Sequence, residues 1–458
     1  MADACDCLVL GGGVAGAGLA LLLAKAGRSV VLVERGQPHL SGPYETLLAP
    51  ARTMLARSGF GPAIEACAER DPLRHGALWG EATIAWRDEA EPGLLLRRGP
   101  FDAALRAAAA AAGARVCTPA LATGHAGRWS IAGPAHRFDV APQQVVFATG
   151  RRVPRPAPAE LVSASPPAFA FTFVGTPAEE DRGTAVVEAV RSGWIWTHAP
   201  HDGPASAAVV VDADELRSRG RAALLADAFA ESLGPAGRLQ QRRLVRANDA
   251  TPRLRAPTAE AWCIGDAAAT IDPLASQGVE KALAAADHAA ALLTTAFTSP
   301  GLAPRLGAVQ HRWERGLFQA HRQVAGAWYA REPRFGDAPF WRARQPRPGP
   351  PGPSRETPLQ VATTLRPARI LVREGPRFVE CDGFVDARTG DEAAHIGYVP
   401  IAPLLACFDP PCRLDASVVR AGQQARLFVL PPRAVHGALQ ELVRRGWLTP
   451  ATTATGSP

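Results

Sequence analysis

Three glycines near the N-terminus have the spacing of a pyrophosphate-binding turn. Gly11, Gly13 and Gly16 form a G-x-G-x-x-G pattern. In such a pattern the first glycine makes a tight turn, the second lets a phosphate approach the backbone, and the third lets a helix pack closely on a strand. The N–H groups at the start of the next helix, including those of Val14 and Ala15, attract negative charge. The spacing therefore predicts a dinucleotide site.

An acidic residue follows where such a site contacts the adenosine ribose. Glu34 ends a predicted strand over 29–33, and Arg35 comes directly after it. A carboxylate at this place accepts hydrogen bonds from ribose hydroxyls. A glycine-rich turn in an alanine-rich chain can be loop chemistry alone. Here, however, a strand over 7–10, the turn, a helix, a second strand and the acid follow in order, which favours the nucleotide site.

A second stretch, WCIGDAAATIDPLASQGVEKAL, has residues that can bind the flavin end of such a dinucleotide. A predicted strand carries Asp266 at its carboxyl end, where the side chain can bind a ribityl hydroxyl and neighbouring N–H groups can bind the pyrophosphate. Gly278 opens a long helix, whose N-terminus can stabilise the negative charge of a reduced flavin ring. The predicted contacts in this stretch are Asp266, Pro273, Gln277, Gly278 and Val279.

Composition predicts a globular protein of two or three domains. The chain has 458 residues, 47% of them apolar, with no apolar run long enough to span a membrane and no leader before the first strand, so a cytoplasmic protein without a membrane partner is expected. Eight scattered cysteines indicate reduced thiols, and no metal site is predicted. The net charge of +7 is almost entirely arginine and forms no basic run, so no nucleic-acid partner is expected.

The elements between these two stretches predict an inserted substrate-binding sheet. A loop entering a helix is expected over 41–60, strands at 79–86 and 92–98, a helix from Pro100 to Gly113 and a buried strand at 144–150. Separated strands and then a helix near 213–233 follow, a pattern typical of an antiparallel sheet. The predicted boundaries are 1–78, 99–157 and 246–300 for the nucleotide-binding part, 79–98 and 158–245 for the substrate sheet, and 302–345 for a helical segment.

A proline-rich linker at 346–358 separates these parts from a small α+β module at 359–450. The module has a strand RLFVLP and an amphipathic helix RAVHGALQELVRRGWL that ends at Gly446, an order similar to a winged helix. From Glu356 onward there are 11 arginines and 10 acidic residues, which is too nearly neutral for a DNA-binding module. Docking of a protein or peptide and a purely structural cap both remain open.

Together these motifs resemble a known superfamily. GGGVAGAG with Glu34, Arg98-x-x-Phe101-Asp102, the ATG at 148–150 and GDAAATIDPLASQGVEKAL are similar to the FAD-dependent aromatic hydroxylases and flavin halogenases of the para-hydroxybenzoate hydroxylase fold. The resemblance implies an α/β fold with a Rossmann-like FAD-binding domain, FAD as cofactor, and Arg98 among its contacts. It also implies oxygen insertion through a flavin C(4a)-hydroperoxide.

Other segments indicate a branch of this superfamily. SGWIWTHAP resembles the halogenase-like branch, and DPLASQGVEKAL is most like flavoproteins that mature peptidyl tryptophylquinone cofactors in quinoprotein amine dehydrogenases. Halogenases use a W-x-W-x-I-P motif and a lysine that carries hypohalous acid to the substrate. Here the segment after Trp196 is one residue too long, and Lys25 and Lys281 lie on predicted nucleotide-site helices. Halogenation is therefore disfavoured.

Two function classes follow from the sequence. The first is an FAD-dependent monooxygenase acting on an aromatic ring, with a protein-borne tryptophan during quinone cofactor biogenesis as the favoured substrate. The second is an FAD-dependent reductase or oxidase of a small or lipid-like molecule. No second nucleotide motif occurs, so an external reductant, NAD(P)H or a reductase, is expected. Catalytic candidates are Glu45 and Asp272, and the C-terminal module is expected to help dock a protein substrate.

Overall fold

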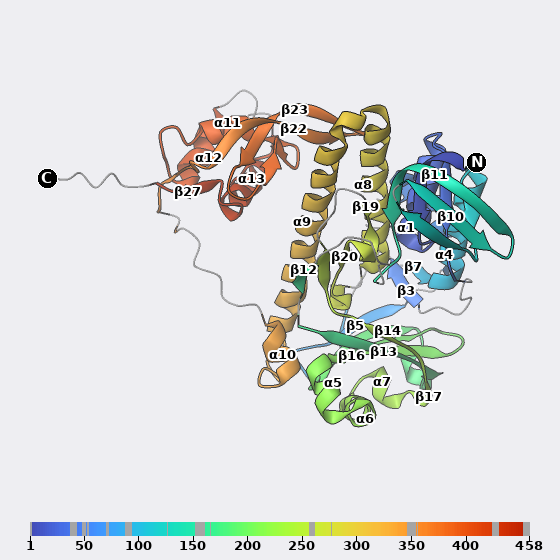
Figure 1. The fold of residues 1–458 in the computed structure, drawn as a ribbon. Coiled ribbons are helices and arrows are strands. Elements are labelled where there is room, and N and C mark those ends of the chain that lie inside the picture. Colours follow the sequence, from blue (N-terminus) through green and yellow to red (C-terminus); the bar gives the residue numbers. More distant parts are fainter. Residues whose placement is uncertain are drawn as a thin grey trace. The chain divides into compact units, whose positions relative to one another are not determined.

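The computed structural model divides into two compact units, Met1–Arg347 and Pro348–Pro458 (Figure 1). The residues that it describes are 2–36, 44–47, 52, 55–69, 73–87, 94–125, 127–151, 161–164, 166–255, 262–275, 277–345, 354, 356–423 and 430–451. The predicted linker at 346–358 lies largely outside these ranges. No helix among the described residues combines the length and apolarity that crossing a membrane requires.

The first unit begins with a seven-stranded sheet in the order β8-β2-β1-β11-β10-β9, with β19 also paired to β11. The strands that form its parallel part are β1 (Asp3–Leu10), β2 (Val30–Val33), β8 (Arg115–Cys117), β11 (His136–Phe147) and β19 (Trp262–Cys263). The antiparallel strands are β9 (Leu121–His125) and β10 (Arg128–Gly133). This confirms the predicted Rossmann-like arrangement around the glycine turn.

Three helices cover one face of this sheet: α1 (Val14–Lys25), α4 (Arg98–Ala111) and α8 (Gly278–Thr298). Helix α1 is apolar on nearly every side because it contacts the sheet and both other helices. The alanine-rich composition lets these helices approach closely, since Gly18 of α1 packs against Leu283 and Ala286 of α8. Gly113 ends α4 with a φ of +104°, as its position after the alanine run predicts.

A second seven-stranded sheet has the order β17-β13-β16-β15-β14-β5-β6. Its strands are β5 (Arg74–Leu78), β6 (Ala85–Trp86), β13 (Ala168–Thr176), β14 (Thr184–Val190), β15 (Gly193–Ala199), β16 (Ala205–Asp212) and β17 (Gln240–Asp249). We call this the substrate sheet. All its strand pairs are antiparallel except β14 with β5.

The strand pairing differs from the predicted bounds of this sheet at both ends. Strand β5 belongs to it, although its residues fall within the 1–78 range predicted for the nucleotide-binding part. The strand predicted at 79–86 is reduced to Ala85–Trp86, because Gly80 adopts a φ of +80° and turns the chain there. At the other end, β17 continues to Asp249, a few residues past the predicted boundary.

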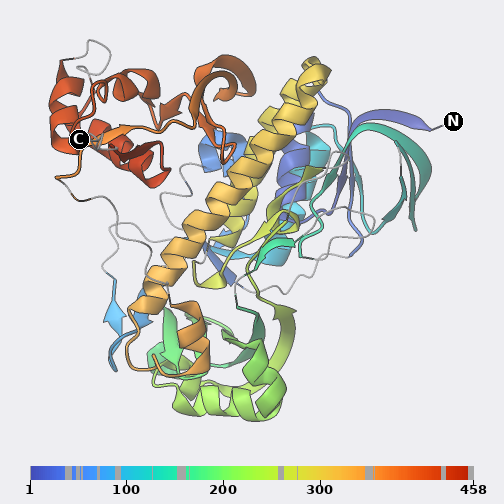
Figure 2. The ribbon, with the colours of Figure 1, turned by 60° about the vertical axis from the view of Figure 1, so that its left-hand side comes forward.

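Helices cover both faces of the substrate sheet. One face packs against α5 (Ala213–Arg219), α6 (Arg221–Glu231) and α7 (Pro235–Arg238). The single helix predicted near 213–233 is two helices, because Gly220 breaks it with a φ of +79°. On the opposite face, part of the sheet is covered by α9 (Ala303–Ala330) and α10 (Pro339–Arg344). Helix α9 runs beside α8 and extends to the sheet (Figures 1 and 2).

Two small sheets lie between these larger layers of the first unit. One contains β3 (Tyr44–Leu47), β7 (Leu94–Arg97) and β4 (Ala68–Glu69), and the other contains β12 (Leu161–Ala164), β18 (Arg253–Arg255) and β20 (Ala269–Thr270). The loop-to-helix segment predicted at 41–60 includes β3, and helix α3 (Gly61–Glu65) follows it. Much of the rest of that segment lies outside the described residues.

The C-terminal unit is an α+β module with its own apolar core. Its elements are β21 (Leu359–Val361), β22 (Leu365–Glu374), β23 (Arg377–Asp386), β24 (Glu392–Ala393), β25 (His395–Ile396), β26 (Val399–Pro400), α11 (Ile401–Ala406), α12 (Leu414–Gly422), α13 (Pro432–Arg444) and β27 (Leu448–Pro450). Helix α13 buries Val435, Leu439 and Leu442, as its periodicity predicts. The strand predicted as RLFVLP lies mostly outside the described residues.

Candidate functional site

The glycine turn between β1 and α1 is formed by contacts that exclude larger side chains. Gly11 has a φ of +106°, and a Cβ there would lie 2.4 Å from the carbonyl oxygen of Ala148. A Cβ at Gly16 would lie 1.9 Å from the carbonyl oxygen of Gly11. Distances this short are impossible without movement of the backbone. The turn and the close packing expected of the first and third glycines are both present.

Gly13 differs from its neighbours because the space above it is open. Its backbone is extended, and a Cβ built there would meet no atom within 4 Å. Helix α1 begins at the next residue, Val14, so the unpaired N–H groups of its first turn, including that of Ala15, are grouped at this opening. An open, positively polarised backbone surface is what a pyrophosphate requires. The turn therefore fits the phosphates of FAD.

Glu34 and a residue that the sequence did not single out hold this turn in place. The Glu34 carboxylate accepts hydrogen bonds from the N–H groups of Gly12, at 2.6 Å, and Gly36, at 2.8 Å. From α4, the buried Arg106 donates to the carbonyl oxygen of Gly12 at 2.7 Å. Arg35 is exposed. In the sequence, Arg106 could have been noticed because it lies two helical turns after Arg98 in α4. Only the structure, however, shows that its side chain reaches the glycine turn.

The two predicted half-sites meet directly. Gly265, with a φ of +63°, lies so close to α1 that a Cβ there would be 2.8 Å from the Cβ of Ala15. Asp266 follows in the one-turn helix Gly265–Ala267. Its carboxylate is 3.4 Å from Nε of Arg151 and 3.5 Å from Nζ of Lys281. A single dinucleotide can therefore contact both the glycine turn and Asp266.

Behind Asp266 lies a buried charged cluster between α8 and α9. The ammonium of Lys281 is buried and also donates to the carbonyl oxygen of Ala269. Glu314 of α9 is buried as well, and it accepts a hydrogen bond from Gln310 at 3.1 Å. Burial raises the pKa of Glu314 to about 7, although Lys281 opposes this shift. The cluster places a fixed positive charge next to Asp266.

The remaining predicted flavin contacts lie at the entrance to α8. Pro273 starts a short turn, Gln277 precedes the helix, Gly278 is its first residue, and Val279 is buried beneath it. A Cβ at Gly278 would meet no atom within 4 Å, so the backbone there is open to a ligand. Helix α8 has 21 residues, and its N-terminus presents N–H groups suited to a negatively charged ring.

The catalytic candidate Asp272 is enclosed in an aromatic cluster. The Tyr329 hydroxyl donates to its carboxylate at 2.9 Å, and the Trp194 indole N–H donates to the Tyr329 oxygen at 3.3 Å. The N–H of Leu274 also donates to Asp272, at 3.0 Å. Burial raises the pKa of the Asp272 carboxyl above its usual value. This chain of hydrogen bonds joins the substrate sheet and α9 to the turn before α8.

The other catalytic candidate, Glu45, is in an ion pair. Its carboxylate lies 3.3 Å from Nη1 of Arg98, which also lies 3.3 Å from Asp102 through its Nε. Arg98 starts α4 beside the nucleotide-binding layer. The structure thus brings Glu45 and Arg98 together, and the catalytic assignment of Glu45 remains a prediction. Glu45 and Asp102 fix the orientation of the Arg98 guanidinium, which stays a predicted contact of FAD.

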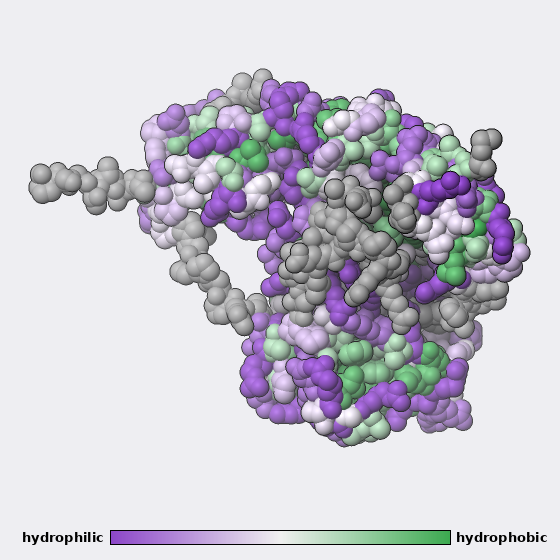
Figure 3. Space-filling model, viewed as in Figure 1, coloured by the Kyte–Doolittle hydropathy of each residue, from purple (hydrophilic) through white to green (hydrophobic). Residues whose placement is uncertain are grey.

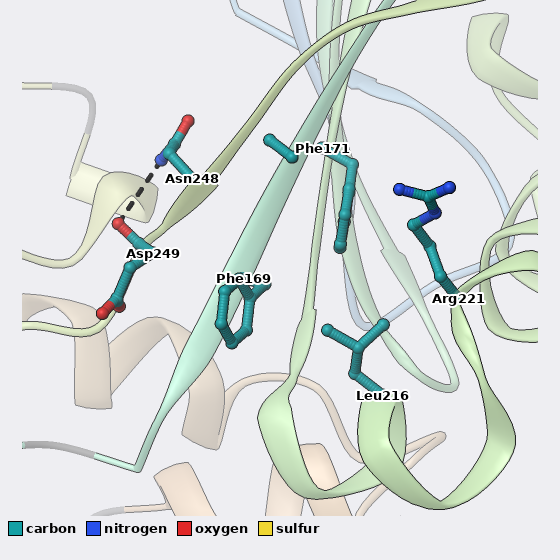
Figure 4. A pocket seen from close by; sticks show the side chains of 7 residues that line it. Phe169, Phe171, Leu216, Arg221, Asn248 and Asp249 are labelled. Carbon is teal, nitrogen blue, oxygen red and sulfur yellow. Dashed lines mark hydrogen bonds between the residues drawn. The ribbon is translucent and has the colours of Figure 1, made fainter.

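A cavity of about 550 Å³ opens on the substrate-sheet face that carries α5 and α6 (Figure 4). It is lined by Phe169, Phe171, Leu216, Arg221, Ala247, Asn248 and Asp249. Figure 3 shows hydrophobic residues gathered on the part of the surface where Figure 1 places β13 and β17. Phe171 lies on the face of the sheet that packs against α6 and α7. Thr172, the next residue in the strand, lies on the opposite face, since side chains of a strand alternate between faces. One lining residue, Asp249, also accepts a hydrogen bond through its carbonyl oxygen from Arg151, the partner of Asp266.

Solved structures with a similar fold include a flavin-dependent halogenase and a peptidyl tryptophan dihydroxylase. Among solved structures, the chain is similar to the flavin-dependent halogenase CmlS, with 19% identity, a TM-score of 0.76, and coverage of 99% of this chain and 97% of that chain. It is also similar to QhpG, a peptidyl tryptophan dihydroxylase essential for tryptophylquinone cofactor biogenesis. There the identity is 22% and the TM-score 0.71, with coverage of 97% of this chain and 100% of that chain.

A third similar structure is a geranylgeranyl bacteriochlorophyll reductase-like protein from Thermoplasma acidophilum. It has 20% identity and a TM-score of 0.58, and the alignment covers 72% of this chain and 87% of that chain. No protein-family model matches the chain, and no curated protein matches it either. The predicted resemblance is confirmed at the level of fold. Alignment to QhpG and CmlS over nearly the whole chain also requires a counterpart of the C-terminal unit in both.

Proposed function

We propose that this protein is an FAD-dependent monooxygenase that hydroxylates an aromatic ring, and that the ring is a tryptophan of a protein or peptide. The observation that carries the proposal is the junction of the glycine turn with the Asp266 turn at Ala15. It supports one continuous dinucleotide site that ends at the face of the substrate sheet that carries Trp194. The fold shared with QhpG supports the tryptophan substrate.

Each end of FAD has a distinct set of contacts in this proposal. The N–H groups around Gly13 and Val14 hold the pyrophosphate, and Glu34 reaches the adenosine ribose. Asp266 holds the ribityl chain, positioned by Arg151 and Lys281. Bound FAD, once reduced by an external donor, supplies the oxygen-activating chemistry. The N-terminus of α8 stabilises negative charge at the ring.

The protein's own part in the reaction is to orient the ring and exclude water. The aromatic cluster that includes Trp194, Tyr329 and Trp341 covers part of the face of the substrate sheet on which the ring would lie. His198 is buried on the same face, and burial lowers its pKa to about 3, so its ring is neutral at physiological pH. Asp272 shapes the turn before α8 through its hydrogen bonds with Tyr329 and Leu274, and its catalytic assignment remains a prediction.

The lysine that would carry hypohalous acid to the substrate in a halogenase is missing from the substrate sheet. Lys25 ends α1, where its Nζ donates to the carbonyl oxygen of Gly59 at 3.3 Å, and Lys281 is buried beside Asp266. These are the two lysines of the chain, and neither lies on the substrate sheet. The fold shared with the geranylgeranyl reductase-like protein supports a reductase as the second candidate function.

The test is turnover under heavy oxygen gas with reduced FAD, chloride and tryptophan-containing peptides, followed by mass spectrometry. Monooxygenation predicts one or two labelled oxygens on the indole ring. A chlorine mass on carbon would establish a halogenase. A parallel reaction contains a prenyl lipid in place of the peptides. Saturation of its double bond, or stoichiometric peroxide with unlabelled product, would establish the reductase or oxidase alternative.

A further inference from the structure

One row of side chains crosses the flavin-facing side of the substrate sheet. In register, Arg246 of β17 pairs with Thr172 of β13, Thr172 with Ala208 of β16, and Ala208 with Trp196 of β15. Residues paired in this way point to the same face of a sheet. Two small side chains therefore lie between a guanidinium on one side and an indole on the other.

This row lies at the border between the covered and the open part of that face. One step along the strands, Ala170, Val210 and Trp194 are buried under the aromatic cluster of α9 and α10. In the row itself, Thr172 and Ala208 keep part of their surface accessible. We call Thr172 and Ala208 the floor. Among the described residues, this partly accessible floor lies directly beside the buried aromatic cluster.

Arg246 lies where this floor approaches the flavin-binding residues. Arg246 is an exposed residue, yet enough protein surrounds its guanidinium to lower its pKa, and the cations of Arg151 and Arg98 lower it further. Asp266 and Glu45 act in the opposite direction. Arg246 therefore lies among charged residues of the predicted cofactor site, on the edge strand of the substrate sheet.

The carboxylates near Arg246 already have partners. Glu45 pairs with Arg98, and Asp266 pairs with Arg151. Asp249, farther along β17, pairs with Arg253. Within the described part of the chain, no carboxylate lies at ion-pair distance from Arg246. A cation near the predicted cofactor site without a counter-ion favours an anion from outside, and the forked guanidinium matches a carboxylate.

On the basis of the function proposed above, we propose that Arg246 binds a carboxylate of the substrate while the aromatic ring lies on the floor formed by Thr172 and Ala208, against Trp196. The carboxylate is either that of an acidic residue close to the target tryptophan or the α-carboxylate of a free aromatic amino acid. This contact would fix the direction in which the ring enters.

The test measures binding and turnover separately on the FAD-loaded full chain. The ligands are a blocked peptide with tryptophan next to aspartate, the same peptide with asparagine, N-acetyltryptophan and its amide. Binding to oxidised enzyme is followed by calorimetry. The wild type should bind the aspartate peptide at least about tenfold more tightly than the asparagine peptide, and Arg246→Gln should abolish that difference. Arg246→Lys should restore part of it, because the charge remains but the fork is lost.

Arg243 provides the matched control, since it is an exposed arginine on the same strand, paired in register with Val174. Arg243→Gln should keep most of the discrimination. Preference for N-acetyltryptophan over its amide, without preference for the aspartate peptide, assigns the carboxylate to a free amino acid. Equal binding of all charged and neutral ligands by the wild type overturns the inference. The inference also fails if Arg246→Gln and Arg243→Gln lose the preference for the aspartate peptide to the same extent.

Loss of FAD from Arg246→Gln also overturns it, because Arg246 would then be a cofactor contact. Oxygen labelling reports on the proposed function independently. If the wild type discriminates between the peptides but inserts no oxygen into either, the monooxygenase proposal fails while the carboxylate site stands.

Discussion

At Gly13 the requirements of folding and of cofactor binding separate. The extended backbone and the open space allow a side chain there, so Gly13→Val should change the free energy of unfolding by no more than about 1 kcal/mol. The same side chain would occupy the space for the pyrophosphate, so FAD affinity should fall by at least about 100-fold. Circular dichroism and FAD titration measure the two effects. Gly316→Val, on α9 where a Cβ also meets no atom within 4 Å, is the control and should bind FAD normally. A yellow Gly13→Val protein would contradict the assignment.

Glu314 should make stability depend on pH. Burial raises its pKa from 4.5 to about 7, so the native state holds this proton more tightly than the unfolded chain does. Its contribution to stability is therefore present at pH 4.5 and is lost as the pH rises to about 7, by about 3 kcal/mol. Denaturant unfolding of the wild type and Glu314→Gln at intervals between these pH values isolates the effect. The variant should gain relative stability as the pH rises, and a difference that stays constant with pH would count against the buried acid.

At the scale of elements, the Tyr329 hydroxyl connects three parts of the fold. It donates to Asp272 before α8 and accepts from Trp194 of β15, while Tyr329 itself belongs to α9. Tyr329→Phe would leave a buried carboxylate with one donor fewer, which should cost about 1–3 kcal/mol of unfolding free energy. Thermal and denaturant unfolding measure this loss. Tyr398→Phe, at a side chain that is 62% exposed, should change stability by less than about 0.5 kcal/mol. Equal stability of the two variants would show that the hydrogen-bond chain is energetically unimportant.

Local sequence signals predicted elements well where the determining contacts are local. The glycine turn, the alanine-rich α4 with its terminal Gly113, and the apolar face of α13 were all readable because spacing along the chain sets them. The placement of β5 was not, since a short strand carries no information about which distant strand it joins. A predicted helix was divided for a different reason, because the φ at Gly220 is known only from structure.

The candidate site shows the same division. Gly13 and Asp266 were identified because their motifs bind phosphate and ribityl groups through local backbone geometry. Arg106 was missed, since it reaches the glycine turn through a contact between distant segments. Arg246, which we propose as a substrate contact, was missed because only the folded chain places it near Arg151 and Arg98. Glu45 was named for its charge, and only the structure shows Arg98 beside it. Residue type predicts chemistry, but partners decide which groups are available.

At the scale of the whole molecule, the division into two units gives a test of the C-terminal module. Each unit has its own apolar core, so a chain ending at Arg347 should fold and bind FAD with unchanged affinity. If the module docks a protein substrate, this shortened enzyme should hydroxylate a short tryptophan peptide normally. Its kcat/KM for the folded partner protein should fall by about tenfold or more, because the second contact is lost. Full activity on the partner would identify the module as a structural cap.

The order of the strands also constrains how the protein can be made. Strand β11 pairs with β1 on one side and with β19 on the other, and β19 begins only at Trp262. The chain meanwhile leaves to form the substrate sheet, whose edge strand β17 ends at Asp249. Neither large sheet can close until more than half of the polypeptide has left the ribosome. Until then the edge of β11 at Val146 and Phe147 stays unpaired, so nascent chains that end before Trp262 should be protease-sensitive and dependent on chaperones.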